Sequence, residues 1–182
     1  MPWIKEFRDR LDQFEDSLPP VEGEIPLSIK VRVDSGCYSR GCCPFAFRLI
    51  DNKLSELQQH PQRFKFEEHE TGPELLVYLA LTTAGLGLAK SMIEFVTAII
   101  KARSEGRKHG DRHDEPVTLV IRRLQDQSTL AEERLFTFHQ NDKVTDSIIE
   151  QLILDGSRKL IQEVKPPRKK TKATKYSRRK KK

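Results

Sequence analysis

Three cysteines lie close together in one stretch of the chain, at Cys37, Cys42 and Cys43. Thiolates are common ligands of structural zinc, and His60 or His69 could supply the fourth ligand of a tetrahedral site. The cysteines lack the paired two-residue gaps of common zinc modules, so the pattern favours loop and core thiols. We therefore predict no metal and no other cofactor at this loop.

A reactive thiol is the second chemistry that this loop could support. Cys37 and Cys42 flank Arg40, and a nearby cation lowers the pKa of a thiol, but the pattern contains no fixed base. The odd number of cysteines and the charged, amphipathic N-terminus, which is unlike a signal peptide, indicate a reducing, intracellular setting. We expect a cytoplasmic protein without a disulfide.

Histidines and carboxylates gather in a second candidate site, at residues 109–115. His109 and His113 lie there with three carboxylates, and both kinds of side chain bind divalent metals. Polar loops of this composition are more often simply solvated. His69 follows Glu68 but has no evident nucleophile to activate as a general base. The sequence thus predicts a noncatalytic protein, with no catalytic residue and no metal ligand. The enzyme alternative would be metal-dependent and would use the cysteine loop or the two histidines.

The C-terminal tail, residues 165–182, is the strongest chemical signal in the sequence. It holds eleven Lys or Arg residues and no acidic one. Such a segment cannot bury a core, so we expect it to be disordered and to bind DNA, RNA or another polyanion by counterion release. Anionic lipid, an address signal and a merely solvating tail are the alternatives. The residues predicted to bind nucleic acid are Lys165, Arg168, Lys169, Lys170, Lys172, Lys175, Arg178, Arg179, Lys180, Lys181 and Lys182, with Tyr176 stacking on a base.

Without the tail, the charge of the chain changes sign. The whole chain carries a net charge of +6, whereas residues 1–164 hold 22 basic and 27 acidic side chains, a net charge of −5. The basic character that would attract a polyanion is therefore concentrated in the tail.

The rest of the chain alternates between helical and strand patterns. Apolar residues recur at steps of three and four within residues 2–18, and this amphipathic helix is expected to fold back onto the core. Strict alternation at residues 28–33 is typical of a half-buried strand. The predicted elements are helices at 2–18, 45–59, 73–104 and from about 143, which Gly156 could interrupt, and strands at 28–33, 63–68, 117–124 and 134–139.

Residues 73–104 hold the longest apolar run, and the pattern predicts one long central helix around which the core packs. Pro73 suits the first turn of a helix, and residues 75–89 carry no charge. From Lys90 onward the pattern is amphipathic. A membrane anchor through residues 75–100 is the alternative, although the uncharged part would reach only about 22 Å, short of the roughly 30 Å hydrocarbon core.

These elements predict an α+β fold: a small mixed sheet of about four strands, with helices packed on one face around the long central helix. The expected organisation is an N-terminal amphipathic helix at 1–20, an α+β domain at 27–164 and a disordered basic tail at 165–182. Composition and length are consistent with one modest hydrophobic core.

The run of residues 70–91, the charged connection after it and the strand at 117–123 resemble the small "effector-associated constant component" modules of bacterial conflict systems. Such modules have a strand, a glycine-bearing apolar helix, a basic segment and a strand hairpin. The resemblance covers residues 64–139 and excludes the tail and the cysteine loop. It implies a noncatalytic adaptor that works beside a peptidase or an NTPase, and hence a protein partner.

Overall fold

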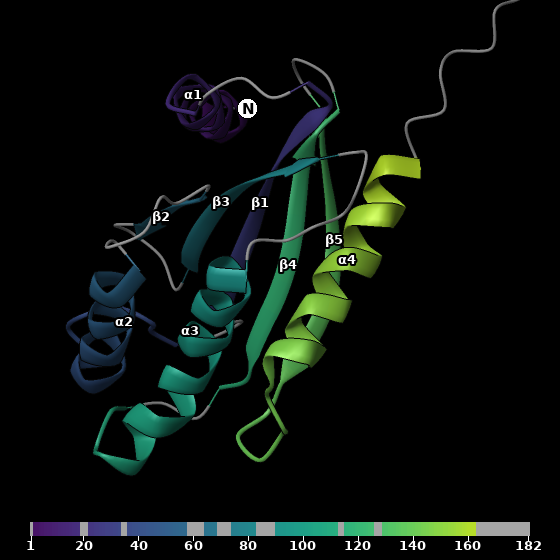
Figure 1. Cartoon of the computed structure of the whole chain (residues 1–182). Coiled ribbons are helices and arrows are strands. Elements are labelled where there is room, and N and C mark those ends of the chain that lie inside the picture. Colours follow the sequence, from purple (N-terminus) through teal and green to yellow (C-terminus); the bar gives the residue numbers. More distant parts are fainter. Residues whose placement is uncertain are drawn as a thin grey trace, which may run out of the picture.

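The computed structural model describes residues 2–18, 22–33, 36–57, 64–68, 74–82, 90–112, 115–125 and 129–162. They form an α+β fold, as the sequence predicts, with five strands where about four were expected (Figure 1). The helices are α1 (Pro2–Asp16), α2 (Pro44–Leu57), α3 (Lys90–Lys108) and α4 (Asp146–Gln162); the strands are β1 (Glu24–Val33), β2 (Phe64–Glu68), β3 (Glu74–Thr82), β4 (Val117–Leu124) and β5 (Leu130–Phe138).

All five strands belong to one sheet in the order β2-β3-β1-β4-β5, and every neighbouring pair is antiparallel. The mixed sheet predicted from the helical crossovers is therefore wrong in strand direction. Each crossover does join two parallel strands, but a third strand lies between them. The path β1-α2-β2-β3-α3-β4 has the connectivity of two interlocked split βαβ units, the ferredoxin-like arrangement, to which β5 and α4 are added.

The long central helix predicted at residues 73–104 is wrong in its first half. Glu74–Thr82 is strand β3, paired with β1 on one side and β2 on the other, and the helix begins only at Lys90. Leu75 and Val77 pack into the main core, whereas Tyr78 packs beneath α1. Because both faces of β3 are covered, the strand lacks polar alternation and its sequence looks like that of a buried helix.

Residues 75–100, the alternative membrane anchor, do not form one continuous helix. This stretch contains a strand of a sheet, and α3 buries its apolar side chains in the core. In the described part of the chain, no helix is both long and apolar enough to cross a bilayer.

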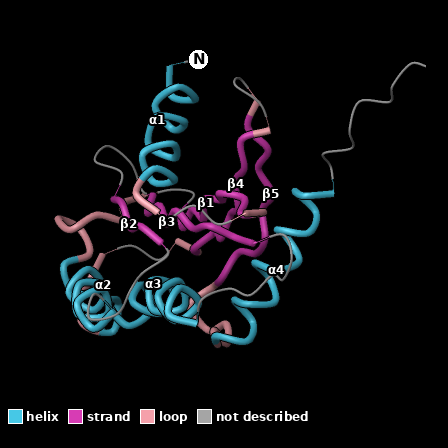
Figure 2. The backbone as a smooth tube through the Cα atoms, turned by 45° about the horizontal axis from the view of Figure 1, so that its top comes forward, coloured by secondary structure: helices cyan, strands magenta, loops and turns pink. Residues whose placement is uncertain are grey.

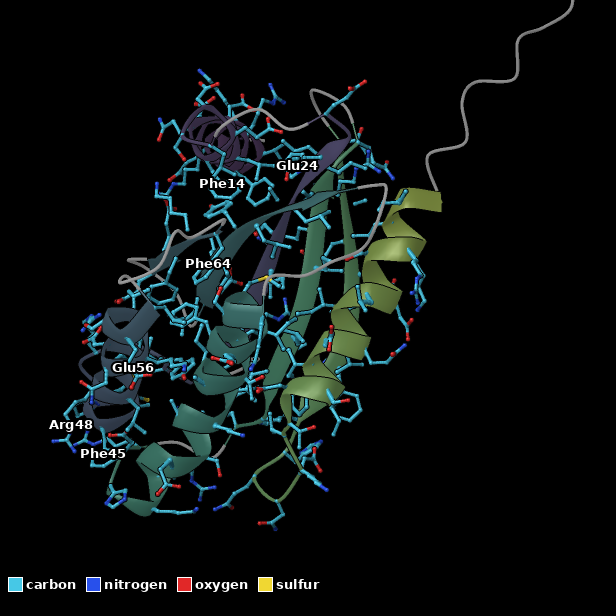
Figure 3. All side chains as sticks on the ribbon, viewed as in Figure 1. Phe14, Glu24, Phe45, Arg48, Glu56 and Phe64 are labelled. Carbon is cyan, nitrogen blue, oxygen red and sulfur yellow. A yellow bond between two sulfur atoms is a disulfide. The ribbon has the colours of Figure 1, made fainter. Side chains whose placement is uncertain are left out.

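Helices cover both faces of the sheet, whereas the sequence predicted helices on one face only. Figure 2 shows α2, α3 and α4 on one side and α1 on the other. The main core lies beneath the three helices, and a second cluster joins α1 to the opposite face. The aromatic stripe of α1 therefore folds back onto the sheet, as expected: the ring centroids of Phe7 and Phe14 each lie about 6 Å from that of Tyr78. Figure 3 shows Phe14 on the side of α1 that faces the sheet.

Gly156 does not interrupt α4, which continues from Asp146 to Gln162. A Cβ atom at Gly156 would lie 2.2 Å from a methyl group of Leu135 and 3.1 Å from one of Ile121. The glycine therefore lets α4 approach β4 and β5 closely, at some cost in helix propensity.

Candidate functional site

Cys37 and Cys42 form a disulfide, which contradicts the expectation of free thiols throughout. Their Cα atoms lie 6.2 Å apart, within the range that a disulfide can bridge. The backbone N–H groups of Cys42 and Cys43 donate to the carbonyl of Ser39, and this turn lies between the two bonded cysteines. Gly36, just before the disulfide, has a φ of 84°, a conformation that residues other than glycine rarely adopt. Neither cysteine is thus available as a thiolate ligand for zinc. The disulfide also removes the cysteine count as an argument for a reducing compartment, and a cytoplasmic location stays a prediction.

Arg40 anchors the cysteine loop instead of activating a thiol. Its two terminal nitrogens donate to both carboxylate oxygens of Asp51 on α2, each at 2.7 Å, and its Nε donates to Glu68 on β2 at 3.0 Å. Such bidentate, charge-assisted pairs are strong and geometrically specific. The hydrogen bonds from Arg40 lower the pKa of Asp51 below its ordinary value. The loop is therefore held to two elements that lie beside it in space.

Cys43 is the free cysteine of the three, and it is fully buried. Its Sγ lies 2.7 Å from a terminal nitrogen of Arg103 on α3 and 3.5 Å from the Sγ of Cys42. Burial raises the pKa of the Cys43 thiol, and the positive charge of Arg103 opposes this effect. The thiol packs in the core and accepts a hydrogen bond, which favours a structural role over a nucleophilic one.

The histidine loop after α3 is used for packing. The ring of His109 stacks on Phe45 at a centroid distance of 4.1 Å, and its Nε2 lies 3.4 Å from Glu105. On its other side, Phe45 carries the guanidinium of Arg48 at 4.3 Å from the ring centre, near the outer end of α2 (Figure 3). These contacts occupy His109 without any metal. The residues that the structure describes contain no group of three or more potential metal ligands.

Asp111, in the same loop, caps helix α2 from a distance in the sequence. Its two carboxylate oxygens accept hydrogen bonds from the backbone N–H groups of Phe45, at 3.0 Å, and Ala46, at 2.8 Å. Cys43 occupies the capping position in the chain, where a thiol is a poor acceptor, so Asp111 takes over that role. A Cβ atom at Gly106 would lie only 2.1 Å from Asp111, which explains the glycine inside α3.

We expect Asp111→Ala to lower the free energy of unfolding by about 1–2 kcal/mol, because two N–H groups at the start of α2 lose their acceptor. Urea unfolding followed by circular dichroism measures the change. Asp111→Asn is the matched control, since asparagine also caps helices and should retain most of the stability. If the alanine and asparagine variants lose equal stability, the cap is not the reason for the aspartate.

Several residues named as candidates from the sequence lie outside the described residues. They include His60, His69 and His113, and all the tail residues between Lys165 and Lys182. The structure therefore places Cys37, Cys42, Cys43 and His109, and it brings the first three together without making a metal site.

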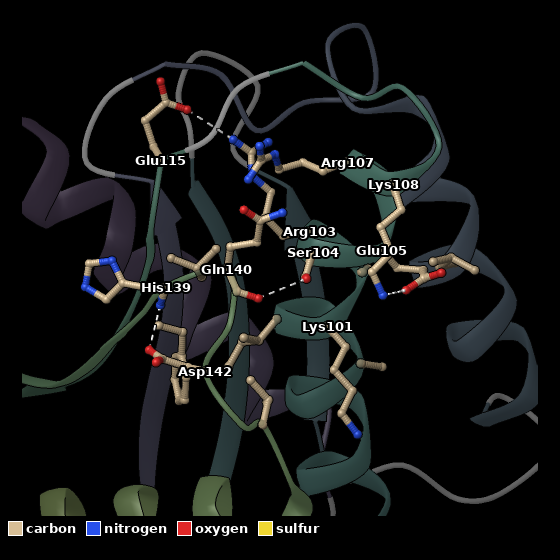
Figure 4. A pocket seen from close by; sticks show the side chains of 17 residues that line it. Lys101, Arg103, Ser104, Glu105, Arg107, Lys108, Glu115, His139, Gln140 and Asp142 are labelled. Carbon is tan, nitrogen blue, oxygen red and sulfur yellow. Dashed lines mark hydrogen bonds and ion pairs between the residues drawn. The ribbon is translucent and has the colours of Figure 1, made fainter.

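A cleft of about 490 Å³ lies between the C-terminal half of α3 and the connection from β5 to α4 (Figure 4). This volume is in the range of small-ligand sites. Its walls combine aliphatic and aromatic side chains with charged ones from α3. The apolar lining comprises Leu49, Ala98, Ile100, Ala102, Val117, Phe138 and Val144, and the polar lining comprises Lys101, Arg103, Ser104, Glu105, Arg107, Lys108, Glu115, His139, Gln140 and Asp142.

The charges of the cleft differ in how far they are already paired. Lys108 Nζ donates to Glu105 at 2.8 Å, and this hydrogen bond lowers the pKa of Glu105. Arg103 reaches Glu115 at 3.3 Å on the inner side of the cleft. Lys101 is exposed, and among the described residues it has no carboxylate within ion-pair distance. It is therefore the cation best able to contact a ligand.

Hydrogen bonds between side chains and the backbone stabilise the opposite wall of the cleft. The hydroxyl of Ser104 donates to the carbonyl of Gln140 at 3.3 Å, and the backbone N–H of His139 donates to Asp142 at 2.7 Å. Both bonds are drawn in Figure 4. The first bond joins the connection after β5 to α3, and the second stabilises the turn within that connection.

The sequence did not reveal this cleft. Lys101 belongs to the polar stripe of α3, which is recognisable from helical spacing. Its partner wall at residues 139–144 is some forty positions later, and no sequence period connects the two. The site could have been found only by knowing that the end of α3 packs beside the connection that follows β5.

Comparisons of the chain with models of protein families, with curated proteins and with solved structures found no significant match. The resemblance to the effector-associated modules therefore stays a prediction.

Proposed function

We propose that this protein is a noncatalytic interaction module that binds nucleic acid or another polyanion. The observation that carries the proposal is the separation of charge along the chain, with eleven cations and no carboxylate in residues 165–182 beside a body of net charge −5. A segment of this charge density binds phosphates through counterion release, without base specificity. The adaptor role and the protein partner that the resemblance implies belong to the same proposal.

A cationic region of the folded body supports the proposal that the body contacts the polyanion together with the tail. Residues 101–112 carry five Lys or Arg side chains and two carboxylates, although the body as a whole is acidic. One of those carboxylates, Asp111, is committed to capping α2. The end of α3 is therefore a cationic region of a body that is acidic overall, where a phosphate backbone meets less repulsion than the net charge implies.

Charge reversal in the cleft tests this contribution of the body. We expect Lys101→Glu combined with Lys108→Glu to weaken binding of a fluorescent single-stranded oligonucleotide about tenfold at low salt, because two phosphate contacts become repulsive. Fluorescence anisotropy with the full-length protein gives the dissociation constants. A parallel series with anionic lipid vesicles separates nucleic acid from lipid as the polyanion.

Two substitutions of the same charge at the other end of the protein provide the control. Lys90 begins α3, is strongly exposed and lies outside the cleft, and Lys5 is exposed on α1. The pair Lys90→Glu and Lys5→Glu changes the net charge equally but should reduce binding no more than about twofold. Equal weakening by both pairs would mean that only net charge matters and that the cleft contacts no phosphate.

A further inference from the structure

A second pocket, of about 330 Å³, lies between α1 and the sheet, on the face opposite to the other three helices. It is separate from both the tail and the cleft at the end of α3. Its lining is unusually rich in charge for a space beneath a helix. The lining residues are Glu6, Phe7, Arg10, Lys30, Glu74, Leu76, Tyr78 and Arg122.

Two cations on neighbouring strands are buried at the base of this pocket. Lys30 on β1 is 4% exposed and Arg122 on β4 is 8% exposed. Burial lowers the pKa of Lys30, and the charge of Arg122 lowers it further, while an ion pair with Glu74 opposes both effects. Two like charges held close together inside a protein repel each other, and an anion placed between them would reduce that repulsion.

Each cation keeps donors that its carboxylate partner does not use. The Nε of Arg122 donates to Glu132 at 2.6 Å, which leaves the N–H groups of its two terminal nitrogens. Lys30 has three N–H groups, and one carboxylate partner, Glu74, is present. The carboxylates therefore compensate the charges of Lys30 and Arg122 without using all of their N–H donors.

Two hydroxyl groups beside these cations are buried without a hydrogen-bond partner. Tyr78 and Ser28 are fully buried, and among the described residues neither hydroxyl has a partner at hydrogen-bonding distance and angle. The guanidinium of Arg10 lies near enough to the Tyr78 hydroxyl to lower its pKa, but it does not meet the geometry of a hydrogen bond. Ser28 is paired in register with Tyr78 on one side and with Arg122 on the other, so the three side chains share this face of the sheet. Burial is the main cause that raises the pKa of Tyr78 to about 12, so its hydroxyl stays protonated and able to donate. Unsatisfied buried hydroxyls are rare in folded proteins.

We propose that this pocket binds the phosphate group of a small molecule, with Lys30, Arg122 and Tyr78 as its ligands. A phosphate carries between one and two negative charges at neutral pH, and its oxygens accept several hydrogen bonds at once. It would lie between the two cations, relieve their repulsion and accept the donor of the tyrosine hydroxyl. A planar carboxylate offers fewer acceptors and less charge to the same three groups.

Helix α1 closes the pocket and gives it an apolar wall. The ring of Phe7 lies 5.8 Å from the guanidinium of Arg122, and Leu76 lines the wall beside it. Arg10 bridges the helix to the sheet through hydrogen bonds to Glu6, at 2.8 Å, and Glu67, at 3.3 Å. A phosphate monoester with an apolar group could place that group against Phe7, whereas free phosphate would leave this wall unused.

Calorimetric titration of the full-length protein with inorganic phosphate and with phenyl phosphate tests the site, at constant ionic strength. We expect saturable binding to wild type with a dissociation constant below about 10 mM. Tighter binding of phenyl phosphate would identify a monoester as the ligand class, and equal binding would identify the free anion. Tyr78→Phe removes only a hydroxyl that makes no hydrogen bond of normal geometry among the described residues, so this variant should fold and yet bind about tenfold more weakly, as expected for one lost hydrogen bond to a charged group.

Arg122→Gln and Arg158→Gln form a second, matched comparison. Both lose one positive charge, but Arg158 is exposed on α4, on the opposite face of the sheet, where it pairs with Asp155. Arg122→Gln should weaken phosphate binding by at least about tenfold, whereas Arg158→Gln should bind as wild type does. Absence of saturable binding to wild type, or equal affinities of wild type, Tyr78→Phe and Arg122→Gln, would overturn the proposal. Because all variants keep the tail, phosphate held by the tail cancels from the comparison.

Discussion

Deleting residues 165–182 is expected to weaken binding to an arbitrary DNA duplex by at least about a hundredfold at about 100 mM salt. The deletion removes eleven of the 33 Lys and Arg residues and leaves a body of net charge −5. The net negative charge of this body disfavours a long phosphate backbone over most of its surface, whereas the end of α3 is locally cationic. Fluorescence anisotropy with full-length and truncated protein measures the difference, and RNA of the same length shows whether the sugar matters.

Salt dependence separates counterion release from other modes of binding. For the full-length protein, affinity should fall about a thousandfold or more between about 50 and 200 mM salt if six or more phosphates are contacted. The control is a full-length chain in which the tail cations are replaced by glutamine, because it keeps the length and loses only the charge. Binding by this variant or by the truncated chain at wild-type strength would remove the tail from the proposed function.

Replacing Arg103 with methionine is expected to lower the free energy of unfolding by about 3 kcal/mol, the lower end of the range for breaking a buried ionic network. Arg103 is 4% exposed and joins three separate parts of the chain. Its terminal nitrogens donate to Cys43 Sγ at 2.7 Å, to the carbonyl of Cys37 at 3.3 Å and to Glu115 at 3.3 Å. Its guanidinium also lies 5.2 Å from the centre of the Tyr38 ring. Methionine fills much of the same space but supplies none of these donors.

Chemical unfolding of the two proteins in urea gives the difference, and Lys101→Met serves as the matched control. Lys101 lies on the same helix, but it is exposed and has no carboxylate partner among the described residues, so its replacement should change stability by less than about 0.5 kcal/mol. A loss of less than about 1 kcal/mol in Arg103→Met would show that the network contributes no more than an ordinary surface contact.

The local periodicity of the sequence was enough to predict most of the elements. The helical spacing of α1, the alternation in β1 and the hairpin of β4 and β5 all appear at or near the predicted positions. In α1 and β1 one face is apolar and the other polar, so the sequence shows which face packs on apolar neighbours and where the element lies in the chain. The separation of the basic tail from an acidic body likewise follows from composition alone.

The tertiary structure decided those features that depend on residues distant in sequence. Strand β3 lost its alternation because α1 covers the face that would otherwise meet solvent, and so its pattern could not be told from that of a helix. Asp111 reaches the start of α2 from more than sixty residues away, and Arg103 on α3 reaches Cys43 from sixty residues away. Lys30 looked like a solvent-facing strand residue, yet the packing of α1 buries it beside Arg122. The local pattern shows which side of an element is apolar, but it does not show what covers the other side. The packing of α1 on the sheet explains both the uniformly apolar sequence of β3 and the pocket beneath α1.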